Sequence, residues 1–144
     1  MSVTSPPQNQ SPSLLQNLQI LVVDDDEDSR DAVALLLEQN GAGVSSASSA
    51  VQALEELERI TPDVMLSDIA MVGVDGYVLI RKIRERELGG GRRIHAIAVS
   101  GYVSLEDRTR ALEEGYDVYL AKPVQPQKLL ELLCAVDSQK DLRR

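Results

Sequence analysis

The stretch Asp63-Val64-Met65-Leu66-Ser67-Asp68, residues 63–68, decides how the rest of this chain is interpreted. Its apolar run is too short for a helix and predicts a buried strand that ends at a carboxylate. Open α/β sheets carry their functional groups beyond the carboxyl ends of their strands. Asp68 is therefore the first candidate for a functional residue.

Two other apolar runs also end in charged side chains. Residues 20–23 lead into Asp24 and Asp25, and residues 118–121 lead into Lys122. In a parallel sheet the carboxyl ends of the strands meet at one edge. The sequence thus predicts three carboxylates and one ammonium group at the same edge.

Strand patterns and helix patterns alternate from residue 19 to the end of the chain. We expect strands at residues 20–23, 44–47, 64–67, 94–99 and 118–121. A helix with apolar residues three and four positions apart follows each strand. Five strands in strict alternation with five helices predict an α/β fold, in which helices cover both faces of a parallel sheet.

Each of these helices has an expected start and an expected buried side. Ser49 and Ser104 have the form of N-caps, and Pro126 suits the first turn of the last helix. The Gly89-Gly90-Gly91 run ends the third helix as a plain connection. The side chains expected inside are Ala32, Val33, Leu36 and Leu37; Ala50, Ala53, Leu54 and Leu57; Tyr77, Ile80 and Ile83; and Leu129, Leu130, Leu133 and Val136.

The ends of the chain differ in composition from its middle. Residues 1–17 are rich in Ser, Pro, Gln and Asn, which predicts a flexible arm or linker. We expect Leu14, Leu15 and Leu18 to be solvated rather than docked as one turn. The folded domain is expected over residues 18–137, followed by a polar tail at 138–144.

Charge and composition exclude several classes of partner. The net charge is −8, the pI is about 4.6 and aromatic residues make up 3% of the chain, which argues against nucleic acid and anionic membrane surfaces. No apolar run approaches the roughly 20 residues of a membrane span. The single cysteine, Cys134, is expected as small core filler and is consistent with a reducing, cytoplasmic setting.

The predicted cluster of carboxylates requires a cation. Two unit charges about 4 Å apart repel by about 4 kcal/mol at an effective dielectric near 20. A few oxygen ligands, with room left for water and phosphate, suit Mg²⁺, which Mn²⁺ could replace. With this metal and Lys122 neutralising the oxygens, the Asp68 carboxylate could attack a phosphorus atom and form an aspartyl phosphate.

Four motifs, in this order and at about this spacing, resemble the receiver domain of two-component response regulators. The resemblance covers about residues 19–136 and implies a flavodoxin-like, doubly wound five-stranded parallel sheet with strand order 2-1-3-4-5 and five surrounding helices. The motifs are Val22-Val23-Asp24-Asp25; Leu66-Ser67-Asp68 with Met71 and Asp75-Gly76; Val99-Ser100-Gly101; and Tyr119-Leu120-Ala121-Lys122-Pro123.

The resemblance implies a role for each acidic residue. Asp68 would be the phosphoacceptor, and its donor would be a phosphohistidine on a histidine kinase or a histidine phosphotransfer protein. Asp25 and Asp68 would bind Mg²⁺ directly, with the backbone carbonyl of Ala70 as a further ligand. Asp24 would act largely through water.

The resemblance also implies a switch. Lys122 and the Ser100 hydroxyl would contact the phosphoryl group, together with the backbone of Ala70 and Gly101. Tyr119 would turn inward behind Ser100 and change the surface formed by the fourth helix, the fifth strand and the fifth helix. A cis peptide bond is expected between Lys122 and Pro123.

Some positions depart from the family pattern. Val72 and His95 stand where proline is common, and Gly101 replaces a frequent alanine. Ala70 and Tyr102 occupy positions that modulate the access of attacking water. The rate of dephosphorylation is therefore left open by the sequence.

Two other functions remain open at this point. Asp24-x-Asp26 after a strand resembles the first motif of haloacid-dehalogenase-type phosphatases, and Asp24 would then be the nucleophile. The acidic pair that this family carries near its fourth strand is missing, because Ser100-Gly101 stands there. A receiver-like binding module that is no longer phosphorylated is the second alternative. The parent protein is expected to be a hybrid histidine kinase or a single-domain regulator.

Overall fold

The computed structural model of the chain describes residues 14–70, 76–101 and 104–142. Strands and helices alternate along these residues, as the periodicity predicts. The strands are β1 (Gln19–Val23), β2 (Gly43–Ala47), β3 (Val64–Asp68), β4 (His95–Ser100) and β5 (Val118–Ala121). The helices are α1 (Glu27–Gln39), α2 (Ala50–Leu57), α3 (Gly76–Leu88), α4 (Leu105–Glu114) and α5 (Pro126–Leu142).

The strands form one parallel sheet in the order β2-β1-β3-β4-β5, which confirms the predicted topology. In the sheet register Val23 lies beside Ser67, and Asp68 lies beside Val99. The strand ends that carry Asp24, Asp68 and Ser100 therefore meet at one edge.

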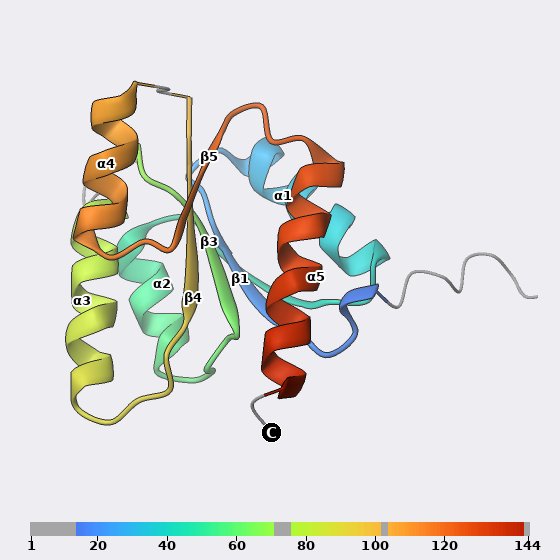
Figure 1. Cartoon of the computed structure of the whole chain (residues 1–144), viewed down its shortest axis with the longest axis horizontal. Helices are drawn as coiled ribbons and strands as arrows, with labels where there is room; N and C mark the ends of the chain where they lie inside the picture. Colours follow the sequence, from blue (N-terminus) through green and yellow to red (C-terminus); the bar gives the residue numbers. More distant parts are fainter. Residues whose placement is uncertain (1–13, 71–75, 102–103, 143–144) are drawn as a thin grey trace, which may run out of the picture.

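Helices cover both faces of the sheet (Figure 1). Helices α1 and α5 lie on one face, where Leu37, Leu129 and Leu133 join a buried cluster. Helices α2, α3 and α4 lie on the other face. Successive residues of a strand pack into opposite clusters, because side chains alternate between the two faces of a sheet. Ile20 packs into the cluster with α1 and α5, and Leu21 packs into the cluster with α2, α3 and α4.

Most of the predicted helix signals are confirmed. The Ser49 side chain accepts from the backbone N–H of Gln52, and the Gln52 side chain accepts from the N–H of Ser48. The predicted inward residues of α2 and α3 are buried or half-buried. In α1 the prediction for Ala32 is wrong: this residue is exposed, because it lies one position away from the stripe that carries Val33 and Leu37.

The structure corrects the expectation for the segment before β1. Leu15 and Leu18 are fully buried in the α1/α5 cluster, and the N–H of Leu15 donates to the carbonyl of Asn40 at 2.8 Å. A solvated segment is therefore wrong for these two leucines, since their burial on the sheet face outweighs the polar composition around them. At the other end, α5 continues through Leu142 across most of the expected tail.

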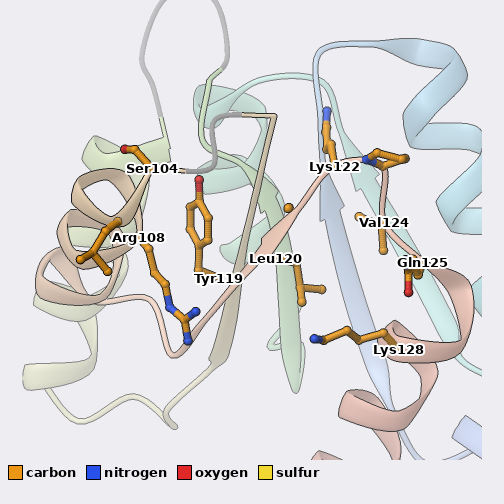
Figure 2. Close-up of a pocket in the computed structure, with 11 residues that line it drawn as sticks. Ser104, Arg108, Tyr119, Leu120, Lys122, Val124, Gln125 and Lys128 are labelled. Atoms are coloured by element: carbon orange, nitrogen blue, oxygen red, sulfur yellow. The ribbon is translucent and has the colours of Figure 1, made fainter.

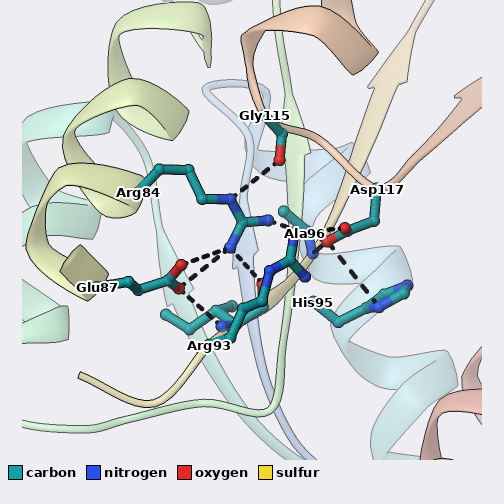
Figure 3. A network of polar contacts seen from close by, with 8 residues as sticks. Arg84, Glu87, Arg93, His95, Ala96, Gly115 and Asp117 are labelled. Carbon is teal, nitrogen blue, oxygen red and sulfur yellow. Dashed lines mark hydrogen bonds and ion pairs between the residues drawn. The ribbon is translucent and has the colours of Figure 1, made fainter. Parts of the chain in front are cut away.

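A polar network lies at the amino ends of β4 and β5, on the opposite side of the sheet from the carboxyl ends that carry Asp24 and Asp68 (Figure 3). The Arg84 guanidinium on α3 donates to the carbonyls of Gly115 and Ile94 at 3.0 and 2.8 Å. It also bonds the carboxylates of Glu87 and Asp117, at 2.9 and 3.0 Å. Arg84 thus ties α3 to the start of β4 and to the loop before β5.

Candidate functional site

Three carboxylates gather at the carboxyl ends of β1 and β3. One ligand oxygen from each of Asp24, Asp25 and Asp68 lies within 4.8 Å of the other two. Asp24 and Asp68 are buried, whereas Asp25 is exposed. An oxygen-only donor set, partly buried and open on one side, fits a hard divalent cation that keeps several waters.

Lys122 brings a positive charge to the same edge from the end of β5. Its Nζ lies 3.0 Å from Asp68 Oδ2 and 3.5 Å from Asp24 Oδ2. Burial lowers the pKa of Lys122, but the hydrogen bond and charge of Asp68 and the charge of Asp24 outweigh it and hold the pKa above its ordinary value. Lys122 is therefore an ammonium cation here, and the cis peptide bond expected before Pro123 is confirmed.

The loop between β1 and α1 is fixed by its own hydrogen bonds. Asp24 Oδ1 accepts from the N–H of Asp26 at 2.9 Å, and Asp26 in turn caps α1 by accepting from the N–H of Asp28. The Arg30 guanidinium donates to the backbone carbonyl of Asp24 at 2.9 Å. Sequence reasoning missed Arg30, since its only sign was a cation one turn into a helix that follows an acidic loop.

Beyond β3, the backbone fixes the orientation of the Asp68 carboxylate. The N–H of Ala70 donates to Asp68 Oδ1 at 2.9 Å, while Oδ2 faces Lys122. Both oxygens are thus held by donors before any ligand arrives. Ala70 itself is exposed, as a residue in contact with an incoming substrate would be.

The remaining predicted site residues lie on β4 and β5. Ser100 is fully buried at the end of β4, one residue beyond the partner of Asp68 in the sheet. Gly101 is exposed, and a Cβ built there would meet nothing within 4 Å, so packing does not require glycine. Tyr119 is half-buried and packs against the cluster on the α2/α3/α4 side.

Several predicted features fall away from this edge or outside the described residues. Met71, Val72, Asp75 and Tyr102 lie outside the residues that the structure describes. His95 begins β4 at the opposite end of the strand from Ser100, with its Nδ1 4.0 Å from Asp117 Oδ2. His95 therefore lies at the opposite end of β4 from the acidic cluster.

Comparisons with known proteins agree on one family. The model of the response regulator receiver domain matches residues 20–134. A relative from Leptolyngbya boryana, named an uncharacterized 14.6 kDa protein in the sodA1 3' region, is 45% identical over 119 residues, which are 83% of this chain and 89% of the relative. The crystal structure of a response regulator receiver domain protein (CheY-like) from Methanospirillum hungatei has a TM-score of 0.76 and 34% identity, with 86% of this chain and 97% of that chain covered.

Two longer relatives are matched over part of their length. Hybrid signal transduction histidine kinase D of Dictyostelium discoideum is 33% identical over 85% of this chain, which is 8% of that protein. The phosphate regulon transcriptional regulatory protein PhoB of Escherichia coli is 33% identical over 81% of this chain, and the chain spans 50% of its length.

Within the described residues, no helix is both long and apolar enough to cross a membrane.

Proposed function

The chain belongs to the response regulator receiver domain family of two-component systems, and on this premise we propose that Asp68 accepts a phosphoryl group from a phosphohistidine. One observation carries the proposal. The buried carboxylate of Asp68 ends β3 with Lys122 Nζ at 3.0 Å and with the oxygens of Asp24 and Asp25 within 4.8 Å. A nucleophile, an ammonium group and a set of cation ligands are thus assembled at one point.

The proposed reaction moves one phosphoryl group between two proteins. An oxygen of Asp68 forms a bond to phosphorus as the bond from phosphorus to the donor imidazole nitrogen breaks, and that nitrogen keeps the electron pair. Asp25, Asp68 and the Ala70 carbonyl would hold Mg²⁺ directly, with Asp24 acting through water. When bound, Mg²⁺ would supply charge neutralisation at the phosphoryl oxygens.

The chain's own groups would complete the site. Lys122, bonded to Asp68 Oδ2 before the reaction, would transfer its hydrogen bond to a phosphoryl oxygen. The Ser100 hydroxyl and the backbone N–H groups of Ala70 and Gly101 would contact the other oxygens. Tyr119 would follow Ser100, and the surface of α4, β5 and α5 would change in response.

The proposed partners follow from this reaction. A histidine kinase or a histidine phosphotransfer protein would be the donor, and the likeness to part of a hybrid histidine kinase fits either an embedded or a separate receiver. The cytoplasmic setting stays a prediction. The phosphatase alternative loses support because the exposed Asp26 of its motif serves as the N-cap of α1.

Mass spectrometry of the intact protein tests the central step. After incubation with acetyl phosphate and Mg²⁺, or with a phosphohistidine donor, wild type should gain one phosphoryl group that maps to Asp68. Asp68→Asn should gain none. Asp26→Asn is the matched control, because it neutralises an exposed acid of the same region and asparagine is an equally good N-cap. A phosphoryl group on Asp24 would favour the phosphatase, and no gain with any donor would favour a binding module.

The metal assignment has a test that needs no phosphoryl donor. Mg²⁺ that binds only the folded state stabilises it by about 2.7 kcal/mol at roughly 100 times Kd. The melting temperature should therefore rise with Mg²⁺ in wild type and not in Asp25→Ala. Asp28→Ala, which removes an exposed acid in the first turn of α1, should keep the response. An unchanged response in Asp25→Ala would refute the ligand assignment.

A further inference from the structure

The hydroxyl of Tyr116 joins two segments that are 40 residues apart in the chain. Tyr116 follows α4, is 3% exposed, and donates from its hydroxyl to the carbonyl of Gly76 at 2.8 Å. Gly76 is the first residue of α3, the helix that follows β3 and Asp68. A tyrosine this deeply buried needs a hydrogen-bond partner for its hydroxyl, and here that partner belongs to the start of α3.

The backbone of Tyr116 is held on both sides. Its N–H donates to the carbonyl of Ala111 in α4 at 3.1 Å, and the N–H of Asp117 donates to the carbonyl of Ala96 in β4 at 2.8 Å. Tyr119 in β5 lies differently, because it lines an open hollow beside α4 (Figure 2). The Tyr116 hydroxyl is therefore a buried donor whose position is set by two neighbouring elements.

Gly76 connects this donor with the residues beside Asp68. The N–H of Gly76 donates to the carbonyl of Ile69 at 3.3 Å, and a Cβ on Gly76 would lie 2.6 Å from the Ile69 Cα. The two backbones are thus in direct contact. The residue after Ile69 is Ala70, whose N–H donates to Asp68 Oδ1 at 2.9 Å. A continuous series of contacts leads from the Tyr116 hydroxyl to the Asp68 carboxylate.

The first turn of α3 keeps other contacts if the hydroxyl is removed. Tyr77 is buried in the same cluster as Ile69 and Tyr116, and the Arg110 guanidinium lies 4.0 Å from the centre of the Tyr77 ring. These contacts do not involve the hydroxyl. Loss of the hydroxyl should therefore shift or loosen the start of α3 without unfolding the helix.

We propose that Tyr116 is a positioning residue for the site at Asp68. Its hydroxyl holds the start of α3 and, through Ile69, sets where the backbone of Ala70 lies. The Ala70 N–H orients the Asp68 carboxylate, and the Ala70 carbonyl is the proposed ligand of Mg²⁺. The consequence for Mg²⁺ and for phosphoryl transfer rests on the proposed function, whereas the effect on the backbone does not.

Amide hydrogen exchange in EDTA, followed by NMR, tests the positioning without a metal or a phosphoryl donor. Tyr116→Phe keeps the ring and removes only the hydroxyl. A hydrogen bond between neutral groups corresponds to a factor of roughly 2 to 12 in an equilibrium constant. The N–H groups of Gly76 and Ala70 should therefore exchange faster in Tyr116→Phe, relative to N–H groups in the middle of β4. Unchanged exchange at Ala70 would overturn the proposal.

Mg²⁺ affinity and phosphorylation by acetyl phosphate test the consequence for the site. Tyr116→Phe should weaken Mg²⁺ binding about threefold in calorimetry and slow the phosphorylation of Asp68 by a similar factor when Mg²⁺ is limiting. Asn40→Ala is the matched control, because it removes an uncharged donor to the Leu36 carbonyl, at the opposite end of α1 from Asp24. The control should lose stability but keep its Mg²⁺ affinity and its rate. Equal changes in both variants would overturn the proposal.

Two results separate this inference from the proposed function. If Tyr116→Phe speeds exchange at Ala70 and weakens Mg²⁺ binding, but wild-type Asp68 gains no phosphoryl group from any donor, the positioning role is confirmed and the proposed function fails. If Asp68 is phosphorylated at the same rate in wild type and Tyr116→Phe, with equal Mg²⁺ affinities, the inference fails and the proposed function stands.

Discussion

Replacing Arg84 by Met removes the side chain that joins α3 to the start of β4 and to the loop before β5. Two carbonyls, of Gly115 and Ile94, lose a donor, and the carboxylates of Glu87 and Asp117 lose a cation. Methionine keeps much of the aliphatic packing, so the charge and the hydrogen bonds account for most of the change.

The magnitude follows from the burial of the network. Breaking a buried ion pair costs about 3 to 5 kcal/mol. The Arg84 and Asp117 side chains are each 19% exposed, so water reaches them, and Asp117 keeps its bonds from Arg93 and from the N–H of Ala96. We therefore expect the free energy of unfolding to fall by an amount near the lower limit, about 3 kcal/mol. The melting temperature should fall by roughly 12 °C.

Urea unfolding followed by circular dichroism measures this loss, since the chain contains no Trp. The control is Arg59→Met, which removes a guanidinium that bonds Glu56 at 2.7 Å but is 69% exposed. An exposed pair contributes about 0 to 1 kcal/mol, so Arg59→Met should change little. Equal losses in the two variants would refute the reasoning, because burial would then have no effect.

The pH dependence gives a second check on the same network. Burial raises the pKa of Asp117, but hydrogen bonds from Arg93 and the N–H of Ala96, with the charges of Arg93 and Arg84, hold it below its ordinary value. A carboxyl with a lowered folded pKa contributes stability above its unfolded pKa, about 3.9, and loses it as the pH falls through the folded value. The difference in free energy of unfolding between wild type and Arg84→Met should have its full value at neutral pH. It should become smaller below about pH 4.

Three further substitutions test the site and its supports. Lys122→Met should lower the free energy of unfolding in EDTA by about 2 kcal/mol, because the buried carboxylates of Asp24 and Asp68 lose their counterion. This is less than the roughly 3 to 5 kcal/mol for a fully buried pair, since the Lys122 side chain is 30% exposed. Mg²⁺ should restore most of the loss in a urea titration. Arg30→Met should weaken Mg²⁺ binding severalfold in calorimetry, because the Asp24 carbonyl loses its hydrogen-bond donor. Arg30→Lys should restore part of the affinity. An unchanged Mg²⁺ affinity in Arg30→Met would exclude a role for Arg30 in positioning Asp24. Gly76→Ala should cost about 1 to 3 kcal/mol, as its Cβ would lie 2.6 Å from the Ile69 Cα, whereas the Cβ in Gly89→Ala meets nothing closer than 3.4 Å.

The sheet and the acidic cluster were predictable because both depend on local pattern. Each strand is an apolar run of a few residues, and parallel pairing brings the ends of these runs together whatever the loops contain. Asp24, Asp25, Asp68 and Lys122 therefore met in space as expected from their place at strand ends.

The polar supports were not predictable in this way. Arg84 lies in the charged segment Arg81-Lys82-Ile83-Arg84-Glu85, where nothing distinguishes it from its solvated neighbours. Its partners Gly115 and Asp117 are 31 and 33 residues away and are brought near only by the completed fold. The tertiary structure determines which groups a long side chain can reach. The hydrogen-bond partners of such a side chain therefore cannot be identified from the sequence pattern alone.

The buried turn at Leu15 has a practical consequence for anyone who trims this protein. The family match begins at residue 20, after Leu15 and Leu18, and ends at residue 134, before the last two turns of α5. A version cut to the matched residues would lose two leucine side chains that together contribute about 3 to 6 kcal/mol, and it would leave an apolar opening between α1 and α5. Poor yield or aggregation of such a fragment would then reflect where it was cut and not the behaviour of the natural chain.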